Sequence, residues 1–300
     1  MFQMTVRRFL IVLTIAVVVL GGLFMLRFIA RVNAEAFLDG QADLTIVHLT
    51  DLHLSSGTNQ RLETAWPNKI IINGYKLHKP CFGKAASFLE ETVAIVNSRI
   101  RPDIVVVTGD IVNNRSDEEA FRMAQNLLHK IECPVIVTDG DHDSSRDAKC
   151  QFAKYFGSSE GELSLNGYRF FSVPFEIDEA DLMKLGDKLR GAQSGRCRIL
   201  CMHRMLYAPY LMRKLSKVYV SDILAPEKEA VLKTLKECAG RCVVLCGHAH
   251  TNYDKEEGNI LQLATSSLAE YPYEMRVIKF SGGTPTTRVF SLDEIRRKKN

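Results

Sequence analysis

The sequence lacks any CxxC pair, although it contains eight cysteines. Zinc ribbons and related structural zinc sites depend on that spacing, so this class of domain is not indicated. Four of the cysteines lie in or beside apolar, strand-like runs, where a free cysteine behaves as a small hydrophobic residue: Cys197, Cys201, Cys242 and Cys246. We predict that the cysteines are mostly reduced and structural, which weighs against a strongly oxidising compartment.

A large charge of either sign is also lacking. The 300 residues include 39 lysines and arginines against 35 aspartates and glutamates, which gives a formal net charge of +4. A nucleic-acid-binding protein would show a concentrated basic face, so we expect no nucleic-acid partner. The one basic run, Arg296–Lys299, lies in the terminal segment 293–300, which we expect to be a frayed, solvated basic tail.

One long apolar run is present near the start of the chain. Residues 9–26 include no charged side chain, and a helix of that length spans about 27 Å, close to the hydrocarbon thickness of a bilayer. We predict that residues 1–32 form an N-terminal transmembrane helix and a single-pass membrane anchor. Two arginines flank each side of the run, so the positive-inside rule does not choose an orientation. The very short N-terminal tail favours the extracytoplasmic side for the rest of the chain.

A cleavable signal segment is the alternative for residues 1–32. Small residues of the kind found at cleavage sites occur at Ala30, Ala34 and Ala36. The apolar run is longer than a usual signal core, which favours the anchor. Residues 33–43 are polar and are expected to form a short linker to a single domain over residues 44–292.

The first half of this domain alternates between apolar runs and segments of helical spacing. Continuous apolar, β-branched runs predict strands at 44–49, 104–107 and 135–137. The helical spacing predicts a helix over 83–99, and Ser116 with Glu119 resembles a capping box that opens a helix to about Lys130. This order of strands and helices is typical of a parallel sheet with right-handed crossovers, so the fold class is α/β.

The second half of the domain is mixed. Helical patterns occur at 178–189 and 226–238, and strands are expected at 168–173, 198–202, 242–245, 260–264, 275–280 and 286–291. The stretch 55–81 is irregular and leaves directly from the first strand. A long loop at the carboxyl end of a strand is the usual place for substrate contacts, and the candidates there are Arg61, Lys69, Tyr75 and His78.

Candidate metal ligands follow five of the predicted strands. The pieces are Asp51-Leu52-His53, Gly109-Asp110, Gly140-Asp141-His142-Asp143 and Gly247-His248-Ala249-His250, with His203 after a fifth strand. A lone histidine is more often a core or surface residue than a ligand, but this joint placement is far more specific. We expect the glycines to permit tight turns that aim the next side chain across the edge of the sheet. Oxygen and imidazole ligands without thiolates suit Mn, Fe, Zn, Ni or Mg, and seven candidates are enough for two ions.

This series resembles that of the calcineurin-like metallophosphoesterases, in which Asp-x-His, Gly-Asp, Gly-Asn-His-Asp/Glu, His and Gly-His-x-His follow one another. The resemblance covers roughly Leu44 to Phe290. It implies a sandwich of two mixed β-sheets flanked by helices, and a metal-dependent phosphoric ester hydrolase. Two divalent ions (Mn, Fe, Zn or Mg, with Fe3+ compatible at one position) would hold a bridging hydroxide that attacks the phosphorus in line.

The resemblance also implies a role for each residue. It assigns one metal ion to Asp51, His53 and His250, a bridging position to Asp110, and the second ion to Asp141, His203 and His248. His142 would be catalytic, facing the phosphate and stabilising the charge that develops on it. Asn113 stands where many members carry an acid that pairs with this histidine, so its side chain is expected to orient His142.

The main departure from the family is Asp141, where the family has asparagine. With Asp51 and Asp110 it sets three carboxylates against two divalent ions, which lowers the net charge of the centre from +2 to +1. We expect tighter metal binding but weaker attraction for phosphate. The leading interpretation is a membrane-tethered phosphoesterase that acts on a small-molecule or lipid phosphomonoester or phosphodiester. The alternative is a catalytically weak or inactive metal-binding relative that serves as a binding or scaffold protein.

Overall fold

The structure, a computed structural model, describes residue 19 and residues 32–57, 71–73, 76–78, 82–144, 151–191, 197–209 and 225–296. Apart from Val19, the predicted membrane helix at 9–26 lies outside these residues. Within the described ranges, no helix is both long and apolar enough to cross a membrane. Residues 32–39 are helical, so the segment predicted as a short polar linker, 33–43, begins in a helix. The chain divides into two compact units, Met1–Gln41 and Ala42–Asn300.

One sheet of the larger unit has the order β13-β12-β1-β4-β5. The three strands predicted in the first half run parallel to one another: β1 (Leu44–Leu49), β4 (Ile104–Thr108) and β5 (Val135–Thr138). On the other side of β1, the two strands β12 (Glu274–Ser281) and β13 (Thr284–Ser291) are antiparallel. All five residues of β4 are buried, as expected for a strand covered on both faces.

A second sheet has the order β10-β11-β9-β8-β7-β6. Its inner strands run parallel: β7 (Tyr168–Ser172), β8 (Cys197–Cys201), β9 (Cys242–Cys246) and β11 (Ile260–Ala264). Antiparallel strands close both edges: β6 (Gly161–Leu165) and β10 (Tyr253–Glu257). A separate two-stranded ribbon, β2 (Ile71–Asn73) and β3 (Lys76–His78), lies within the stretch predicted to be irregular.

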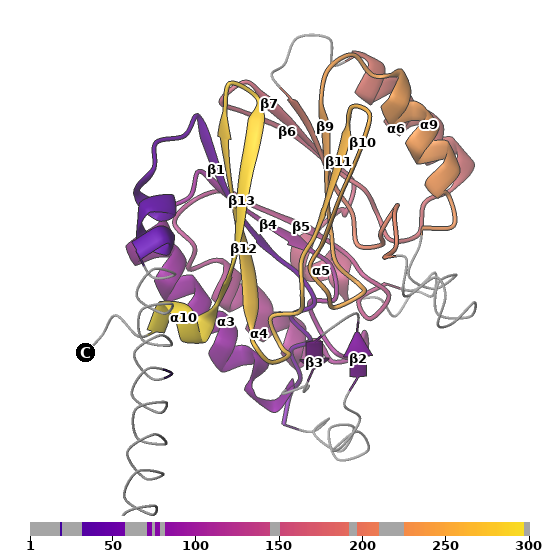
Figure 1. Cartoon of the computed structure of the whole chain (residues 1–300). Coiled ribbons are helices and arrows are strands. Elements are labelled where there is room, and N and C mark those ends of the chain that lie inside the picture. The colour runs from indigo at the N-terminus through magenta and orange to yellow at the C-terminus, as the bar shows by residue number, and fades with distance from the viewer. Residues whose placement is uncertain are drawn as a thin grey trace, which may run out of the picture. The chain divides into compact units, whose positions relative to one another are not determined.

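Alternation along the strands builds the two apolar layers. Phe170 belongs to the core between the two sheets, with Ile46 and Ile278 of the first sheet, whereas the next residue, Phe171, belongs to the core beneath the helices. That outer layer is formed by α6 (Glu179–Gly191) and α9 (Lys228–Glu237), which contact each other (Figure 1). The prediction of two mixed sheets flanked by helices is confirmed.

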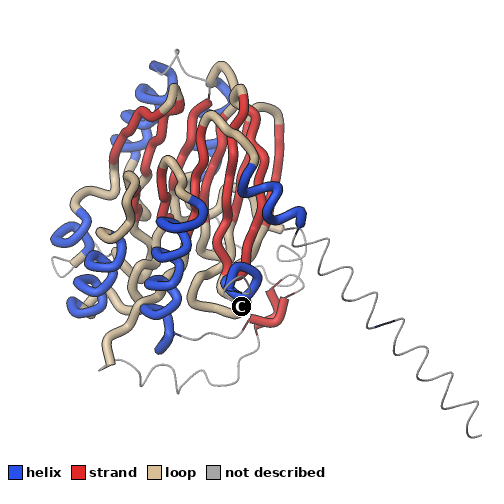
Figure 2. Tube along the Cα trace, turned by 90° about the vertical axis from the view of Figure 1, so that its left-hand side faces the viewer, coloured by secondary structure: helices blue, strands red, loops and turns tan. Residues whose placement is uncertain are grey.

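The helices on the opposite flank are α3 (Ala85–Ile95), α4 (Glu118–Leu128) and α10 (Leu292–Arg296), and α3 contacts both of the others (Figures 1 and 2). The 3-10 turn Phe82–Lys84 precedes α3 and the π-helical turn Val96–Ile100 follows it, while α5 (Phe152–Phe156) packs on α4. The capping prediction was wrong by one residue, because the Asp117 carboxylate, and not Ser116, accepts the Ala120 N–H at 3.0 Å. The first residues of the predicted tail differ from the expectation, because the α10 residue Arg296 pairs with Glu91 and Ile295 is buried; residues 297–300 lie outside the described residues.

The described cysteines follow the prediction. All six are free, and five of them are buried in the apolar layers: Cys197, Cys201, Cys238, Cys242 and Cys246. Burial raises the pKa of the Cys201 thiol, which keeps it protonated. These cysteines act as small hydrophobic residues.

Candidate metal centre

The candidate ligands come from the carboxyl ends of neighbouring parallel strands. In the first sheet, Asp51 and His53 follow β1, Asp110 follows β4 and Asp141 follows β5. In the second sheet, His203 follows β8, and the pair His248 and His250 follows β9. Parallel strands present their carboxyl ends at one edge, so the topology gathers all seven side chains where the two sheets meet.

Several of these residues have left-handed backbone conformations. Positive φ angles occur at Asp51 (51°), His53 (46°), Asp110 (52°), His248 (65°) and His250 (48°). Aspartate and histidine tolerate this region better than most residues, and such strain concentrates at functional sites. Backbone hydrogen bonds hold two of the turns: Asp51 N–H donates to Gly109 O at 3.0 Å, and His53 N–H donates to Asp110 O at 2.9 Å. The turns are therefore made largely by the ligands themselves.

The motif glycines are needed mainly for close approach. A Cβ on Gly140 would lie 2.2 Å from Asp110 Oδ1, and one on Gly247 would lie 1.9 Å from Thr50 Oγ1. The prediction that the glycines permit tight turns holds for Gly109, which has φ +83°. At the other two positions the reason is different, because any side chain would displace the ligand loops.

The first ligand group contains Asp51, His53, Asp110 and His250. The His53 and His250 Nε2 atoms lie 3.1 Å apart, and His250 Nε2 lies 3.1 Å from Asp51 Oδ1. Asp110 Oδ2 lies 3.6 Å from His53 Nε2. The four donor atoms all lie within 4.8 Å of one another.

The second ligand group contains Asp110, Asp141, His203 and His248. Asp141 Oδ1 lies 3.0 Å from His248 Nδ1 and 3.2 Å from His203 Nε2. His203 Nε2 lies 3.4 Å from Asp110 Oδ2, the same oxygen that faces His53 in the first group. Asp110 is thus shared by the two groups.

The donor set and its spacing fit two metal ions. Ligand atoms about 2.1 Å from one ion, at the angles of common coordination geometries, lie about 3.0–3.4 Å from each other. The pairs in both groups fall in or near that range. Asp51 Oδ1 is buried and accepts no hydrogen bond from the described residues, although His250 Nε2 is only 3.1 Å away. Two donor atoms that face a common point in this way are arranged to bind an ion.

Surrounding groups fix the tautomers of two ligand histidines, so that the nitrogen facing the centre is the one without a hydrogen. His203 Nδ1–H donates to the Thr108 carbonyl at 2.7 Å, which leaves Nε2 free to coordinate. His250 Nδ1–H donates to Glu270 Oε1 at 2.9 Å, with the same consequence. The sequence reasoning missed Glu270, because it lies on a loop after the last ligand motif and no strand leads into it.

The charges in the site shift its proton affinities. Burial lowers the pKa of His203, but the surrounding carboxylates of Asp110, Asp141 and Asp51 together raise it well above its ordinary value. His250 behaves in the same way, with Glu270 as its main carboxylate neighbour. Burial favours protonated Asp51, yet the adjacent His250 holds the pKa of this carboxyl well below its usual range. Metal binding must therefore displace protons from His203 and His250.

His142 faces the centre without belonging to either ligand group. Its ring packs edge-on against His53, with centroids 4.8 Å apart, and its Nε2 lies 3.9 Å from Asp141 Oδ2. Its Nδ1 bonds to the backbone carbonyl of Asn113 at 2.8 Å. The expectation that the Asn113 side chain orients this histidine is corrected here, because the contact comes from the main chain.

Asp143 joins the loops that carry Asp110 and Asp141. Its carboxylate accepts the backbone N–H groups of Ile111 and Val112, both at 3.0 Å, and that of Gly140 at 2.9 Å. The sequence motif included this residue but gave it no role. Its hydrogen bonds set the spacing of the two loops and hence of the bridging ligand.

Three of the four substrate candidates on the long loop, Arg61, Lys69 and Tyr75, lie outside the described residues. His78 is the last residue of β3.

Comparison with known proteins agrees with the geometry. The chain matches the calcineurin-like phosphoesterase family over residues 44–283. Over 112 residues it is 25% identical to a probable glycerophosphodiester phosphodiesterase, GpdQ, of Arcobacter nitrofigilis. That match covers 37% of this chain and 34% of the relative, so it spans about a third of the relative's length.

Two solved structures are similar in fold. A dimetal phosphatase from Danio rerio superposes with a TM-score of 0.58 and 14% identity, over 84% of this chain and 99% of that chain. A purple acid phosphatase from yellow lupin (Lupinus luteus) seeds gives a TM-score of 0.58 and 11% identity, over 85% of this chain and 52% of that chain. At these identities the likeness concerns the fold.

Proposed function

The chain belongs to the calcineurin-like phosphoesterases and is a metal-dependent phosphoester hydrolase. From this premise we propose that it hydrolyses a phosphomonoester or phosphodiester at a dinuclear metal centre, and that the protein is anchored in a membrane. The observation that carries the proposal is the pair of four-residue groups that share Asp110. A shared carboxylate is what a two-ion site requires, because the ions must lie close enough to act on one phosphate.

Each group has a defined part in this proposal. The first ion would be held by Asp51, His53 and His250, the second by Asp141, His203 and His248, and Asp110 would bridge them. When bound, two divalent ions polarise phosphoryl oxygens and lower the pKa of an attacking water. The protein positions the ligands rigidly, through the left-handed turns and through the hydrogen bonds of Glu270 and Asp143.

His142 is the candidate for proton donation to the leaving group. Its Nδ1 is held by the Asn113 carbonyl, which leaves Nε2 directed away from the main chain. The side chain is 40% exposed, so a substrate can reach it. An N–H at this position would stabilise the charge that develops as the ester bond breaks.

The proposed substrates include both phosphomonoesters and phosphodiesters. The name of the Arcobacter relative supports phosphodiesters, and the family as a whole supports monoesters as well. The apolar run at 9–26 supports a membrane anchor with the hydrolase domain on the extracytoplasmic side, and lipid-linked esters are therefore among the substrates to test. Retention of the full chain in carbonate-washed membranes would test the anchor; release of a shortened chain would indicate a cleaved signal.

The enzymatic test uses the full chain in detergent, stripped of metal and reloaded with Mn(II). Hydrolysis of p-nitrophenyl phosphate and bis-p-nitrophenyl phosphate would be compared, with Asp110→Asn as the matched control. We expect metal-dependent turnover that Asp110→Asn abolishes, and the preferred substrate would separate a monoesterase from a diesterase. Metal binding without turnover, with both Mn and Fe, would contradict the catalytic proposal.

One feature favours a second candidate function, a metal-binding scaffold with little activity. Asp141 replaces the family asparagine and adds negative charge next to the phosphate position. Its Oδ1 nevertheless lies 3.0 Å from His248 Nδ1 and 3.2 Å from His203 Nε2, as a ligand oxygen would. This placement fits a metal ligand in both candidate functions, so the family match supports the hydrolase and the turnover test above separates the two.

A further inference from the structure

An arginine that the sequence reasoning did not single out lies beside the second ligand group. Arg204 directly follows His203, and its Cζ lies 4.0 Å from the ring centroid of Phe175. The Phe175 ring in turn lies 5.9 Å from the His203 ring and 6.5 Å from the His248 ring, between centroids. The Phe175 ring therefore lies between the Arg204 guanidinium and the two ligand histidines.

The charge of Arg204 is not balanced in the way that comparable arginines are. Arg169 and Arg288 also stack on phenylalanines, and each pairs with a glutamate, Glu162 and Glu294 respectively. Among the residues that the structure describes, Arg204 forms no ion pair, which sets it apart from both. Its buried Nε also has no hydrogen-bond partner, a feature that it shares with Arg169. A buried N–H without a partner is costly, so this group is prepared for an acceptor that the described protein residues do not supply.

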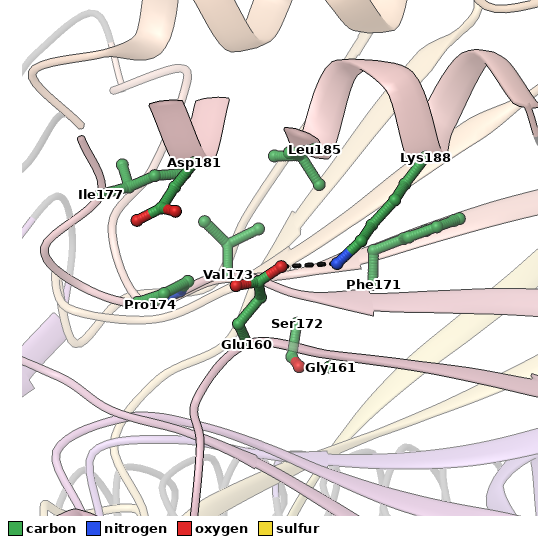
Figure 3. A pocket seen from close by; sticks show the side chains of 10 residues that line it. All are labelled: Glu160, Gly161, Phe171, Ser172, Val173, Pro174, Ile177, Asp181, Leu185 and Lys188. Carbon is green, nitrogen blue, oxygen red and sulfur yellow. Dashed lines mark hydrogen bonds and ion pairs between the residues drawn. The ribbon is translucent and has the colours of Figure 1, made fainter. Parts of the chain in front are cut away.

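A lysine close to the Phe175 segment, Lys188, is already paired with a carboxylate. Val173 and Pro174, which precede Phe175, line a hollow beneath α6, where Lys188 pairs with Glu160 (Figure 3). The lysine and the glutamate in this hollow therefore neutralise each other. Within the described ranges, Arg204 is the cation at the ends of β7 and β8 that is left to meet an anion from solution.

We propose that Arg204, held against Phe175, binds a second anionic group of the substrate, a phosphate or a carboxylate, next to the scissile phosphate. The planar guanidinium offers paired N–H donors that match such groups, and stacking on an aromatic ring leaves those in-plane donors free. The scissile phosphate belongs at the two ligand groups, so an anion on the Phe175 side is a separate part of the same molecule. This inference rests on the proposed function and narrows its substrate class to phosphate esters that carry a second acid group, such as diphosphate esters.

The test compares anions as inhibitors of p-nitrophenyl phosphate hydrolysis by the full chain, with Mn(II) kept in excess. The probes are inorganic phosphate, inorganic diphosphate and phosphonoacetate, which pairs a phosphonate with a carboxylate. We expect Arg204→Met to raise the inhibition constant of diphosphate at least about tenfold, the loss of one charged hydrogen-bonded contact, and to change that of phosphate far less. The phosphonoacetate result distinguishes a carboxylate from a phosphate as the second group. Arg288→Met removes an arginine of the same kind, stacked on Phe290 away from the centre, and should change neither constant.

Arg204→Lys keeps the charge and a flexible stem, so it serves if Arg204→Met fails to fold; it should lose part of the diphosphate preference because lysine lacks the planar fork. Equal weakening of phosphate and diphosphate, or no change in either, would overturn the proposal. Calorimetric binding of the same anions to the metal-loaded protein reads the preference without turnover. A chain that hydrolyses nothing would refute the hydrolase proposal, while this binding ratio would still decide the role of Arg204.

Discussion

The Nδ1 atom of His250 lies 2.9 Å from Oε1 of Glu270, so a buried carboxylate holds the ring with its Nε2 atom directed at Asp51. Glu270 is 2% exposed and lies on the loop between β11 and β12. It orients a ligand without joining either ligand group.

We predict that Glu270→Gln weakens binding of one of two Mn(II) ions by about tenfold, within the 10–100-fold range known for partners of ligating histidines. Glutamine keeps an acceptor oxygen but loses the charge that makes the imidazole a stronger donor. Isothermal titration of the stripped protein measures the effect. The matched control is Glu256→Gln. Glu256 lies on the edge strand β10, and its exposed carboxylate pairs with Arg241. Equal affinities in both variants would show that the Glu270 contact does not tune the metal.

We predict that Asp141→Asn raises turnover and loosens one ion. The amide keeps an oxygen in the ligand position while removing a negative charge, so the centre attracts phosphate more strongly and binds its second ion less tightly. A loss of about tenfold in affinity corresponds to about 1.4 kcal/mol. Steady-state kinetics measures the turnover, and metal titration on the same preparation measures the affinity for the ions. Asp181→Asn, at a half-buried residue of α6 that pairs with Lys184, controls for the loss of a carboxylate away from the centre. For Asp141→Asn, an unchanged rate with unchanged metal content would defeat the charge argument.

The seven candidate ligands could be predicted because their identity and their position after a strand are both local features of the sequence. Glu270 could not, because the fold, and no local pattern, brings it to His250. Asn113 was assigned a side-chain role, but His142 uses its backbone carbonyl, which every residue type supplies. Strand β10 escaped prediction for a related reason: as an edge strand it is polar on both faces, so Tyr253–Glu257 shows no apolar alternation.

We predict that Gly140→Ala disrupts both ions together. A methyl group at this position would lie 2.2 Å from Asp110 Oδ1 and 2.5 Å from Asp110 N, so the bridging residue must move. Overpacking of this kind costs about 1–3 kcal/mol of stability. Metal content per chain and thermal unfolding would both be measured. In Gly191→Ala the new methyl group meets nothing within 4 Å, so the fold and both ions should be retained. Loss of a single ion in Gly140→Ala would argue against Asp110 as the shared ligand.

We predict that His48 makes the metal-free protein sensitive to mild acid. The ring is buried between two hydroxyl groups, Thr108 Oγ1 and Thr265 Oγ1, each at 2.8 Å. Burial, helped by the nearby Arg276, lowers the pKa of His48 to about 3, against an unperturbed value of about 6.5 in the unfolded chain. The unfolded state therefore binds this proton more tightly. The stability that His48 contributes is complete above pH 6.5 and falls by about 1.4 kcal/mol per pH unit from there towards pH 3.

His48→Gln removes the titrating ring while keeping groups that can hydrogen-bond to both threonines. The free energy of unfolding of this variant should be lower at pH 7 than that of the unmodified chain. Between pH 6.5 and 4.5 it should also fall less steeply, and the two slopes should differ by about 1.4 kcal/mol per pH unit. Urea unfolding of stripped protein at several pH values measures the two slopes. His129→Gln, at the exposed end of α4, should keep the steeper slope. Parallel slopes for His48→Gln and the unmodified chain would mean that His48 is reached by protons in the folded state, and that its burial between the threonines does not exclude the charged form.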